Sequence, residues 1–179
     1  MELVTPSIKY QQSYCDYIAE LANEERYPFP LDFDFTDFEA LLAKLADYAA
    51  GKNLPAGYVP SSTLWLVDND QLLGVTNIRH YLNEQIKHCG GHIGLGIRPS
   101  YRGKGLGNLL MRLSIAHLKQ KGVTPIHIHC YQDNYASANC IISNGGVLES
   151  ELVLDEAMAK QIGPVKVQPV KIVQRFIVK

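Results

Sequence analysis

The chain has 179 residues, of which 46% are hydrophobic and 20% are charged, and its formal net charge is −1. This length suits one domain with a sizeable core and is short for two domains. The balanced charge gives no global basic field, so we expect neither nucleic acid nor a membrane surface as a partner. No apolar run approaches the roughly 18 residues of a membrane span, and the first ten residues lack a signal-peptide pattern, which favours a cytoplasmic protein.

The first third of the chain predicts a short strand followed by two helices. We expect the strand over Glu2–Val4 and the first helix over Ile8–Asn23, where apolar residues recur at spacings of three and four. Two prolines then interrupt the helical pattern. The second helix is expected over Thr36–Ala50, with Thr36 as its N-cap, Glu39 as the capping-box partner and the following glycine as its end.

The middle of the chain predicts a hairpin and one further strand. Leu64–Val67 and Leu72–Ile78 are apolar and flank the turn residues Asp68–Asp70. The polar segment Asn83–His88 fits either a short helix or an extension of the hairpin. The next strand is expected over His92–Ile97.

The remaining chain alternates helices and strands. We expect a helix from Leu106 that Gly122 ends, a strand over Pro125–Cys130, a short helix that Asp133 or Asn134 caps and Asn144 closes, and strands over Val147–Leu154 and Val167–Val178. A strand, helix and strand in succession imply a right-handed parallel crossover. The predicted fold class is α/β: one domain over residues 1–179, with a single mixed, mostly antiparallel sheet, helices on both faces and a central parallel crossover.

A glycine-rich turn within residues 91–108 joins a predicted strand to a predicted helix. Such a turn leaves backbone N–H groups unpaired at the positive end of the helix dipole, which makes an anion site out of main chain. Arg102 and Lys104 add positive charge at this place. Gly103, Gly105 and Gly107 lack a Cβ, so a phosphate-bearing ligand can come close.

Two common phosphate motifs do not fit this turn. The P-loop pattern needs a glycine where Arg98 stands and a serine or threonine where Gly105 stands. The Rossmann pattern needs a glycine at Asn108. The pattern Arg-x-x-Gly-x-Gly does fit at Arg102, Gly105 and Gly107, and the surrounding segment resembles the acetyl-CoA pyrophosphate loop of the GNAT superfamily of N-acetyltransferases. The alternative is a turn that only joins strand to helix.

The resemblance runs from Leu64 to about Leu152 and includes the segments DNYAS and NGG after the crossover. It implies a GNAT-like fold and an enzyme that moves an acetyl group from acetyl-CoA to a primary amine by direct attack in a ternary complex. Acetyl-CoA is implied as the co-substrate. The implied CoA-binding residues are Leu95, Ile97, Arg98, Arg102, Gly103, Lys104, Gly105, Leu106, Gly107, Asn108, Asn134 and Ser137.

Two positions depart from the commoner family pattern. Many members place a glutamate near the start of the strand before the phosphate loop as general base, and here that place falls on His92, whose imidazole has a suitable pKa. The alternative for His92 is a histidine hydrogen-bonded at a strand end. Many members also carry a tyrosine as acid for the thiolate, where this chain has Ile141. Tyr131, Tyr135 or water could take that role, or the thiolate leaves unprotonated; we expect no tyrosine to act as this acid.

The resemblance also places the acceptor beside the linker between the first two helices, residues 24–37, which is acidic and aromatic. Its carboxylates would attract a cationic amine; the alternative is a solvated loop whose aromatic side chains pack into the core. The acceptor is either a small amine or a peptide amine. Its identity, the acyl length and the oligomeric state stay open, a homodimer being one option. A rival class of function is a non-catalytic acyl-CoA-binding regulatory module.

The four cysteines form no C-x-x-C pair, so free thiols are expected. Zinc sites usually show paired spacings that close four ligands. Two short groupings of potential ligands lack that arrangement, and we therefore expect no metal: His127, His129 and Cys130, and His88, Cys89 and His92.

Overall fold

The computed structural model describes residues 1–154 and 171–179. In chain order its elements are β1 (Glu2–Val4), the 3-10 turn η1 (Ile8–Tyr10), α1 (Gln11–Leu21), the 3-10 turn η2 (Phe29–Asp32), α2 (Phe38–Ala50), β2 (Ser61–Asp68), β3 (Gln71–Arg79), α3 (Glu84–His88), β4 (Ile93–Ile97), the 3-10 turn η3 (Pro99–Tyr101), α4 (Leu106–Gln120), β5 (Ile126–Tyr131), α5 (Tyr135–Ser143), β6 (Val147–Leu154) and β7 (Lys171–Val178). The strand expected from Val167 is seen from Lys171, and residues 167–170 lie outside the described part of the chain.

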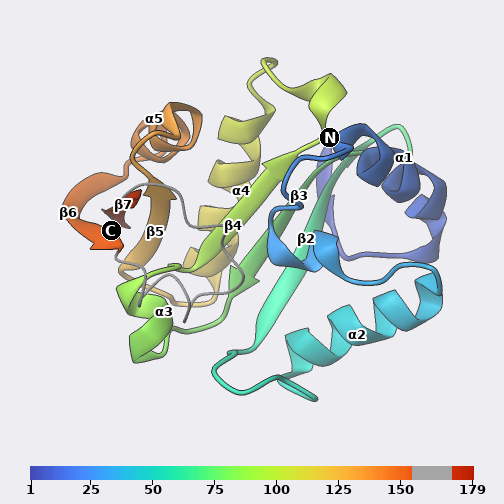
Figure 1. Ribbon diagram of the computed structural model, residues 1–179, viewed down its shortest axis with the longest axis horizontal. Helices are drawn as coiled ribbons and strands as arrows, with labels where there is room; N and C mark the ends of the chain where they lie inside the picture. The colour runs from blue at the N-terminus through green and yellow to red at the C-terminus, as the bar shows by residue number, and fades with distance from the viewer. Residues whose placement is uncertain (155–170) are drawn as a thin grey trace.

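The strands form a four-stranded sheet in the order β1-β2-β3-β4 and a three-stranded sheet in the order β5-β7-β6. Every pair within these two sheets is antiparallel. In the described part of the chain the sheets share one isolated bridge, between Gly91 and Ile128, beyond which β4 and β5 diverge (Figure 1). The α/β class with mostly antiparallel strands is confirmed. The predicted single sheet with a central parallel crossover was wrong: the described strands form two sheets without a parallel pair, and a core cluster with side chains from both sheets, α4 and α5 lies between them.

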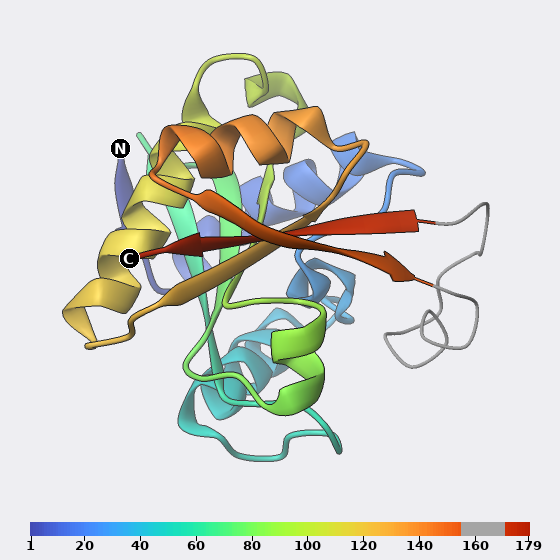
Figure 2. The same ribbon diagram turned by 90° about the vertical axis from the view of Figure 1, so that its left-hand side faces the viewer.

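Helices cover both faces of the sheets. α1 and α2 pack on one face of the four-stranded sheet, where Tyr14, Tyr17 and Trp65 are almost completely buried. α4 packs on the other face through Leu110 and Leu118, and α5 runs along the three-stranded sheet (Figure 2). Each large buried side chain contributes on the order of 2 kcal/mol. None of the described helices has the length and apolar character that a membrane span requires.

β4 pairs with β3 along one edge. Among residues 1–154 and 171–179, no strand pairs with its other edge beyond the bridge at Gly91. At the end of this ladder the Arg98 N–H donates to the Leu73 carbonyl oxygen at 2.9 Å. Because hydrogen-bonded pairs alternate in an antiparallel ladder, the N–H and C=O groups of Ile93, Leu95 and Ile97 point away from β3. The divergence from β5 therefore leaves a strand edge to which an extended ligand can hydrogen-bond.

The second helix begins later than the sequence pattern predicts. Asp37 is its N-cap, and its Oδ1 accepts a hydrogen bond from the Ala40 N–H at 3.0 Å. The predicted cap, Thr36, was wrong: its N–H and hydroxyl donate to Asp34 Oδ1 at 2.9 and 2.8 Å. The carboxylates of Asp34 and Asp37 are better acceptors for free N–H groups than the Thr36 hydroxyl, so Asp34 forms the turn and Asp37 caps the helix. Gly51 ends the helix in a left-handed conformation, as predicted.

Candidate active site

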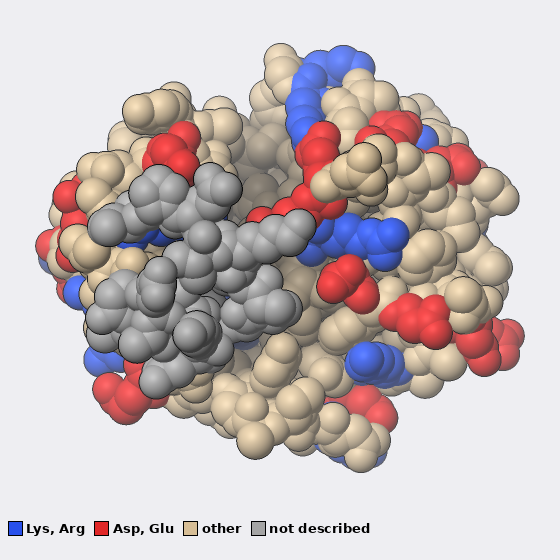
Figure 3. All heavy atoms as spheres, viewed as in Figure 1, with Lys and Arg blue, Asp and Glu red and all other residues tan. Residues whose placement is uncertain are grey.

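The turn before α4 presents main-chain donors to open space. Gly103 and Gly105 adopt φ values of +73° and +76°, and a Cβ on either would meet nothing within 4 Å. The Leu109 N–H makes the first bond of the helix, to the Gly105 carbonyl oxygen at 3.2 Å, so the N–H groups of residues 106–108 precede it. The surface is hollowed between this turn and the side that carries α5 (Figure 3). An anion in the hollow would accept hydrogen bonds from these N–H groups and face the positive end of the helix dipole.

Gly107 has a packing role. A Cβ on this residue would lie 3.1 Å from the Cys140 Sγ of α5. Asn144, which follows α5, donates from Nδ2 to the Asn108 carbonyl oxygen at 3.4 Å. The absence of a side chain at Gly107 therefore lets α5 approach the start of α4 and form one wall of the hollow.

α5 begins directly after β5 and carries three residues of the sequence prediction. Asn134 Oδ1 accepts from the Ser137 N–H at 3.0 Å and caps the helix, as predicted. Ile141 is buried in the core that α4 and β5 share. Tyr135 is 74% exposed, whereas Tyr131, the last residue of β5, is half-buried. Burial raises the pKa of Tyr131, so this phenol keeps its proton at neutral pH.

Arg98 joins α1 to the phosphate turn. Its side chain is 7% exposed, and Nε donates to Glu20 Oε1 at 2.8 Å. The other carboxylate oxygen of Glu20 accepts from the Ser100 N–H at 3.0 Å. Arg98 therefore faces α1 through a partly buried ion pair, and its part in CoA binding stays a prediction.

Arg102 and Lys104 lie on the exposed side of the same turn. The Arg102 guanidinium holds Glu24 through both nitrogens, with Nη2 2.8 Å from Oε2 and Nη1 3.1 Å from Oε1. Its Nε donates to the Ile97 carbonyl oxygen at 3.0 Å, on the open edge of β4. Lys104 Nζ donates to the Ser100 carbonyl oxygen at 3.0 Å. A phosphate ligand would therefore compete with Glu24 for the guanidinium.

The linker between α1 and α2 lies directly on β4, where two glycines make room for it. A Cβ on Gly96 would collide with the Tyr27 carbonyl oxygen, and one on Gly94 would lie 2.8 Å from the Tyr27 hydroxyl. The residue as a whole is 47% exposed, yet burial around the hydroxyl raises the pKa of Tyr27. Tyr27 was not among the predicted site residues. Its signal was the alternation of glycines with bulky residues in β4, which indicates that another segment approaches one face closely.

The aromatic residues of this linker pack against the core, which was one of the two interpretations of the sequence. Phe33 and Phe35 are partly buried against the core formed by α1, α2 and β2. Phe29 and Phe33 also contact the ring of Tyr48 on α2, with centroid distances of 6.3 and 5.4 Å. Glu24 and Glu25 are exposed beside them. The linker thus combines a packed aromatic side with a carboxylate rim.

His92 joins the two diverging strands at their closest point. Its N–H donates to the His127 carbonyl oxygen at 2.7 Å, and its Nδ1 accepts from the His127 N–H at 3.0 Å. The side chain is 5% exposed, and burial, aided by the neighbouring His127, lowers the pKa of His92 to about 4. A neutral imidazole that accepts at Nδ1 carries its proton on Nε2. This arrangement is the strand-end alternative for His92, and its role as a general base stays a prediction.

Replacing His92 by asparagine is expected to make the protein less sensitive to acid. The folded pKa lies below the ordinary value of 6.5, so the stability present above pH 6.5 is lost as pH falls towards 4, by up to about 3 kcal/mol. An asparagine amide accepts from the His127 N–H without titrating. The free energy of urea unfolding at pH 7, 5 and 4 should therefore fall less steeply in His92→Asn.

The control is His88→Asn, which removes an exposed histidine from the end of α3. It should follow the parent protein at every pH. Parallel curves for His92→Asn and the parent would contradict a buried, neutral His92 with a lowered pKa. Turnover lost in His92→Asn without any loss of stability would instead support the general base.

Metal ligation has no support in the described residues. Across residues 1–154 and 171–179, no group of three or more histidine, cysteine, aspartate and glutamate side chains is placed to hold a metal ion. The four cysteines are free thiols. His129, one of the residues considered as a ligand, instead accepts from the Gly90 N–H at Nδ1, at 3.0 Å.

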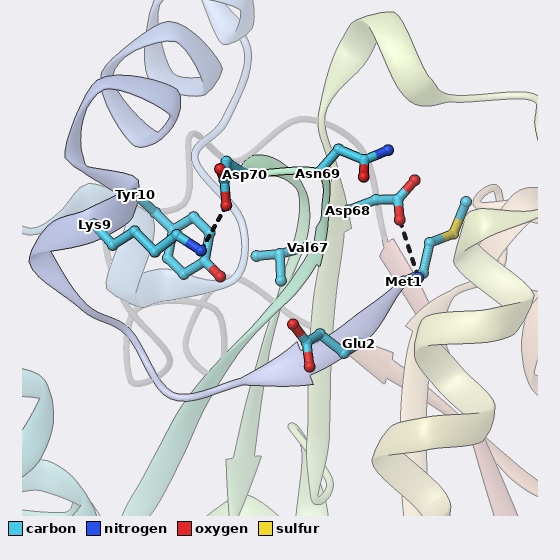
Figure 4. A pocket seen from close by; sticks show the side chains of 8 residues that line it. All are labelled: Met1, Glu2, Lys9, Tyr10, Val67, Asp68, Asn69 and Asp70. Atoms are coloured by element: carbon cyan, nitrogen blue, oxygen red, sulfur yellow. Dashed lines mark ion pairs between the residues drawn. The ribbon is translucent and has the colours of Figure 1, made fainter.

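A second depression lies at the turn between β2 and β3 (Figure 4). Two ion pairs cross it: the Met1 amino group with Asp68 at 3.0 Å, and Lys9 with Asp70 at 2.6 Å. None of its lining residues belongs to β4, α4 or β5; they are Met1, Glu2, Lys9, Tyr10, Val67, Asp68, Asn69 and Asp70. This depression is therefore separate from the hollow at the start of α4.

The model of the acetyltransferase (GNAT) family matches residues 16–141, from α1 to α5. The chain belongs to this family. As a GNAT acetyltransferase it is an enzyme that uses acetyl-CoA as its co-substrate, which confirms the resemblance found in the sequence. The matched range includes the open edge of β4, the glycine-rich turn and the start of α5. No curated protein sequence matches the chain.

Solved GNAT structures share the fold over nearly the whole chain. The structure of yncA from Salmonella typhimurium with its cofactor acetyl-CoA has a TM-score of 0.64 at 16% identity, covering 99% of this chain and 92% of that one. A spermidine N-acetyltransferase SpeG chimera from Vibrio cholerae and hSSAT has a TM-score of 0.65 at 16% identity, covering 99% and 96%. The Salmonella typhimurium acetyltransferase that modifies the N-terminal serine of ribosomal protein L7/L12 has a TM-score of 0.66 at 14% identity, covering 99% and 94%. At these identities the likeness concerns the fold.

Proposed function

We propose that this GNAT acetyltransferase moves an acetyl group from acetyl-CoA to a primary amine by direct attack in a ternary complex. One observation carries the proposal. The open edge of β4, with the outward N–H groups of Leu95 and Ile97, leads into the turn where residues 106–108 present free N–H groups. An extended arm with a diphosphate at its end, the shape of CoA, matches a strand edge followed by a helix N-terminus.

The proposed CoA contacts follow this line. The pantetheine arm would pair with β4 at Leu95 and Ile97, and the diphosphate would lie on residues 102–108. Asn134 and Ser137 would contact the arm from the β5 side, and Arg98 would hold the turn in place through α1. Arg102 and Lys104 would supply positive charge once phosphate displaces their present partners.

The chemistry needs a neutral amine and a polarised thioester. An alkyl amine with a pKa near 10 is mostly protonated at pH 7 and must lose a proton before it attacks. An outward N–H of β4 would donate to the thioester oxygen as it becomes negative. The amine nitrogen then bonds to the acetyl carbon and passes its extra proton to water, while the carbon–sulfur bond breaks and the thiolate leaves. Tyr131 at the end of β5 and Tyr27 against β4 both keep their protons at neutral pH, and either phenol could protonate the thiolate.

The test is incubation of the purified protein with acetyl-CoA and an amine panel, with free thiol as the readout. The panel holds polyamines, amino acids and short peptides with free N-termini, since the related structures include enzymes for spermidine and for a ribosomal protein. Thiol release that depends on one class of amine supports the proposal. Tight CoA binding by calorimetry without release for any class would support the non-catalytic module. A cytoplasmic location and a homodimer stay predictions.

Removing the Glu24 carboxylate is expected to tighten CoA binding about two- to fivefold. Glu24→Gln frees the Arg102 guanidinium for phosphate, and the gain is small because both partners of this ion pair are about half exposed to solvent. Calorimetry with CoA measures the change. Asp32→Asn is the matched control, because it removes the same charge from a pair with Arg26 elsewhere on the linker. Unchanged or weaker binding in Glu24→Gln would contradict the competition.

A further inference from the structure

The face of β3 and β4 that lies under Tyr27 is polar near the start of β4. Asn77 is the cross-strand partner of Gly94, and both share the face on which Tyr27 lies. Arg79 follows two residues later on β3, so it shares this face with Asn77. The intervening Ile78 points to the opposite face, into the core with α4.

Arg79 is a partly buried cation without a carboxylate partner in residues 1–154 and 171–179. Its Nη1 donates to the carbonyl oxygens of Gly91 and Gly90, at 2.8 and 3.5 Å. The other arginines beside the linker and the phosphate turn, by contrast, each pair with an acid: Arg26 with Asp32, Arg98 with Glu20 and Arg102 with Glu24.

The described groups around Arg79 that favour its charged form are not carboxylates. Burial lowers the pKa of Arg79, and the groups that act in the other direction are Tyr27, Tyr58 and Cys89. Burial also raises the pKa of Tyr27 and of Cys89, so both stay neutral at pH 7. Buried or partly buried charges in proteins are normally paired, because desolvation of an unpaired charge is costly.

The position of Arg79 separates it from the phosphate turn. Its N–H donates to the His92 carbonyl oxygen at 2.8 Å, just before β4, whereas the turn follows the other end of that strand. A strand of this length spans roughly 16 Å. The diphosphate of CoA on residues 102–108 is therefore remote from Arg79, and an anion at Arg79 would belong to the acceptor.

We infer that the acceptor amine also carries a carboxylate, which pairs with the planar guanidinium of Arg79, so that its class is amino acids and not polyamines. This inference rests on the proposed function and narrows its substrate class. A guanidinium can bind a carboxylate through two parallel N–H···O hydrogen bonds. The N–H groups of Arg79 that do not donate to Gly90 and Gly91 can make such a pair of bonds. The carboxylate would anchor the acceptor at the start of β4, and the amine would extend towards Tyr27 and the thioester.

The experiment compares amines in matched pairs, each an amino acid and its amide, in parent protein and in Arg79→Gln. In the parent protein kcat/KM should be at least about tenfold higher for the acids. Arg79→Gln should lower kcat/KM for the acids by about thirtyfold or more and change the amides by less than about threefold. Arg79→Lys keeps the positive charge but loses the planar guanidinium. Its kcat/KM for the acids should lie between those of the parent protein and Arg79→Gln. Equal or better turnover of the amides in the parent, or an equal loss for both classes in Arg79→Gln, would overturn the inference.

Two further measurements separate this inference from the proposed function. Calorimetry with CoA is done first on each variant, and Arg112→Gln on the exposed side of α4 controls for loss of one positive charge. If no panel member is acetylated, N-acetyl amino acids and N-acetyl amino acid amides are titrated into CoA-saturated protein. Binding of the acids alone, lost in Arg79→Gln, supports the inference; equal binding or none overturns it. Failure of CoA itself to bind would overturn the proposed function at an earlier step.

Discussion

Gly105→Val is expected to weaken CoA binding by more than about a hundredfold while the protein remains folded. Gly105 is the N-cap of α4 with φ +76° and ψ 1°, a conformation that disfavours an L side chain by about 1–2 kcal/mol. Its surroundings are open, so the variant can relieve the strain by shifting the turn. Such a shift moves the N–H groups of residues 106–108 away from the phosphates. Hydrogen bonds to charged groups contribute about 1.5–3 kcal/mol each, so losing two gives the stated factor.

Calorimetry with CoA measures the loss, and thermal unfolding reports the fold. Gly122→Val is the matched control, because Gly122 also has φ +76°, also has nothing within 4 Å of a Cβ, and lies just beyond the other end of α4. It should lose similar stability and keep its CoA affinity. If Gly105→Val binds CoA as tightly as the control, the diphosphate does not lie on this turn.

Gly96→Ala is expected to lower turnover by at least about tenfold and to change CoA affinity by less than about threefold. The new Cβ would collide with the main chain at Tyr27, which has to move off β4 because the strand is held by β3. Overpacking of this kind costs about 1–3 kcal/mol of stability. The proposed CoA contacts lie on the outward edge of β4, at Leu95 and Ile97, and are spared. Steady-state kinetics with acetyl-CoA and calorimetry with CoA separate the two effects.

Gly74→Ala on β3 is the control for overpacking. Its Cβ would meet Ile97 Cδ1 at 2.7 Å and Leu110 Cδ2 at 3.1 Å, on the face that α4 covers. This variant should lose comparable stability without moving Tyr27, and its turnover should follow its stability. Equal turnover in the two glycine variants would mean that the linker position has no part in the reaction.

Local patterns in the chain predicted the elements whose physics is local. The spacing of apolar residues in α1 and α4 follows the helical period, and Gly51 and Gly122 stop helices because they accept a left-handed backbone. Asn134 was recognised as a cap because a cap acts within three residues. The error at Thr36 also has a local cause: three acceptors stand close together at positions 34, 36 and 37, and propensity alone does not choose among them.

The sequence by itself determined the fold class, the family and the glycine-rich turn before α4, since each depends on short runs of residues that act on their own backbone. Only the tertiary structure decided which side chains lie together around β4. Tyr27 meets Gly94 and Gly96, His92 meets His127, and Arg79 donates to Gly91 and has no acidic partner among the described residues, all through segments distant in the chain. The physical reason is that the divergence of β4 from β5 and the packing of the linker on β4 both depend on contacts between residues far apart in the chain. Such contacts are selected by the burial of the whole core and leave only a weak trace, such as alternating glycines, in any one stretch of sequence.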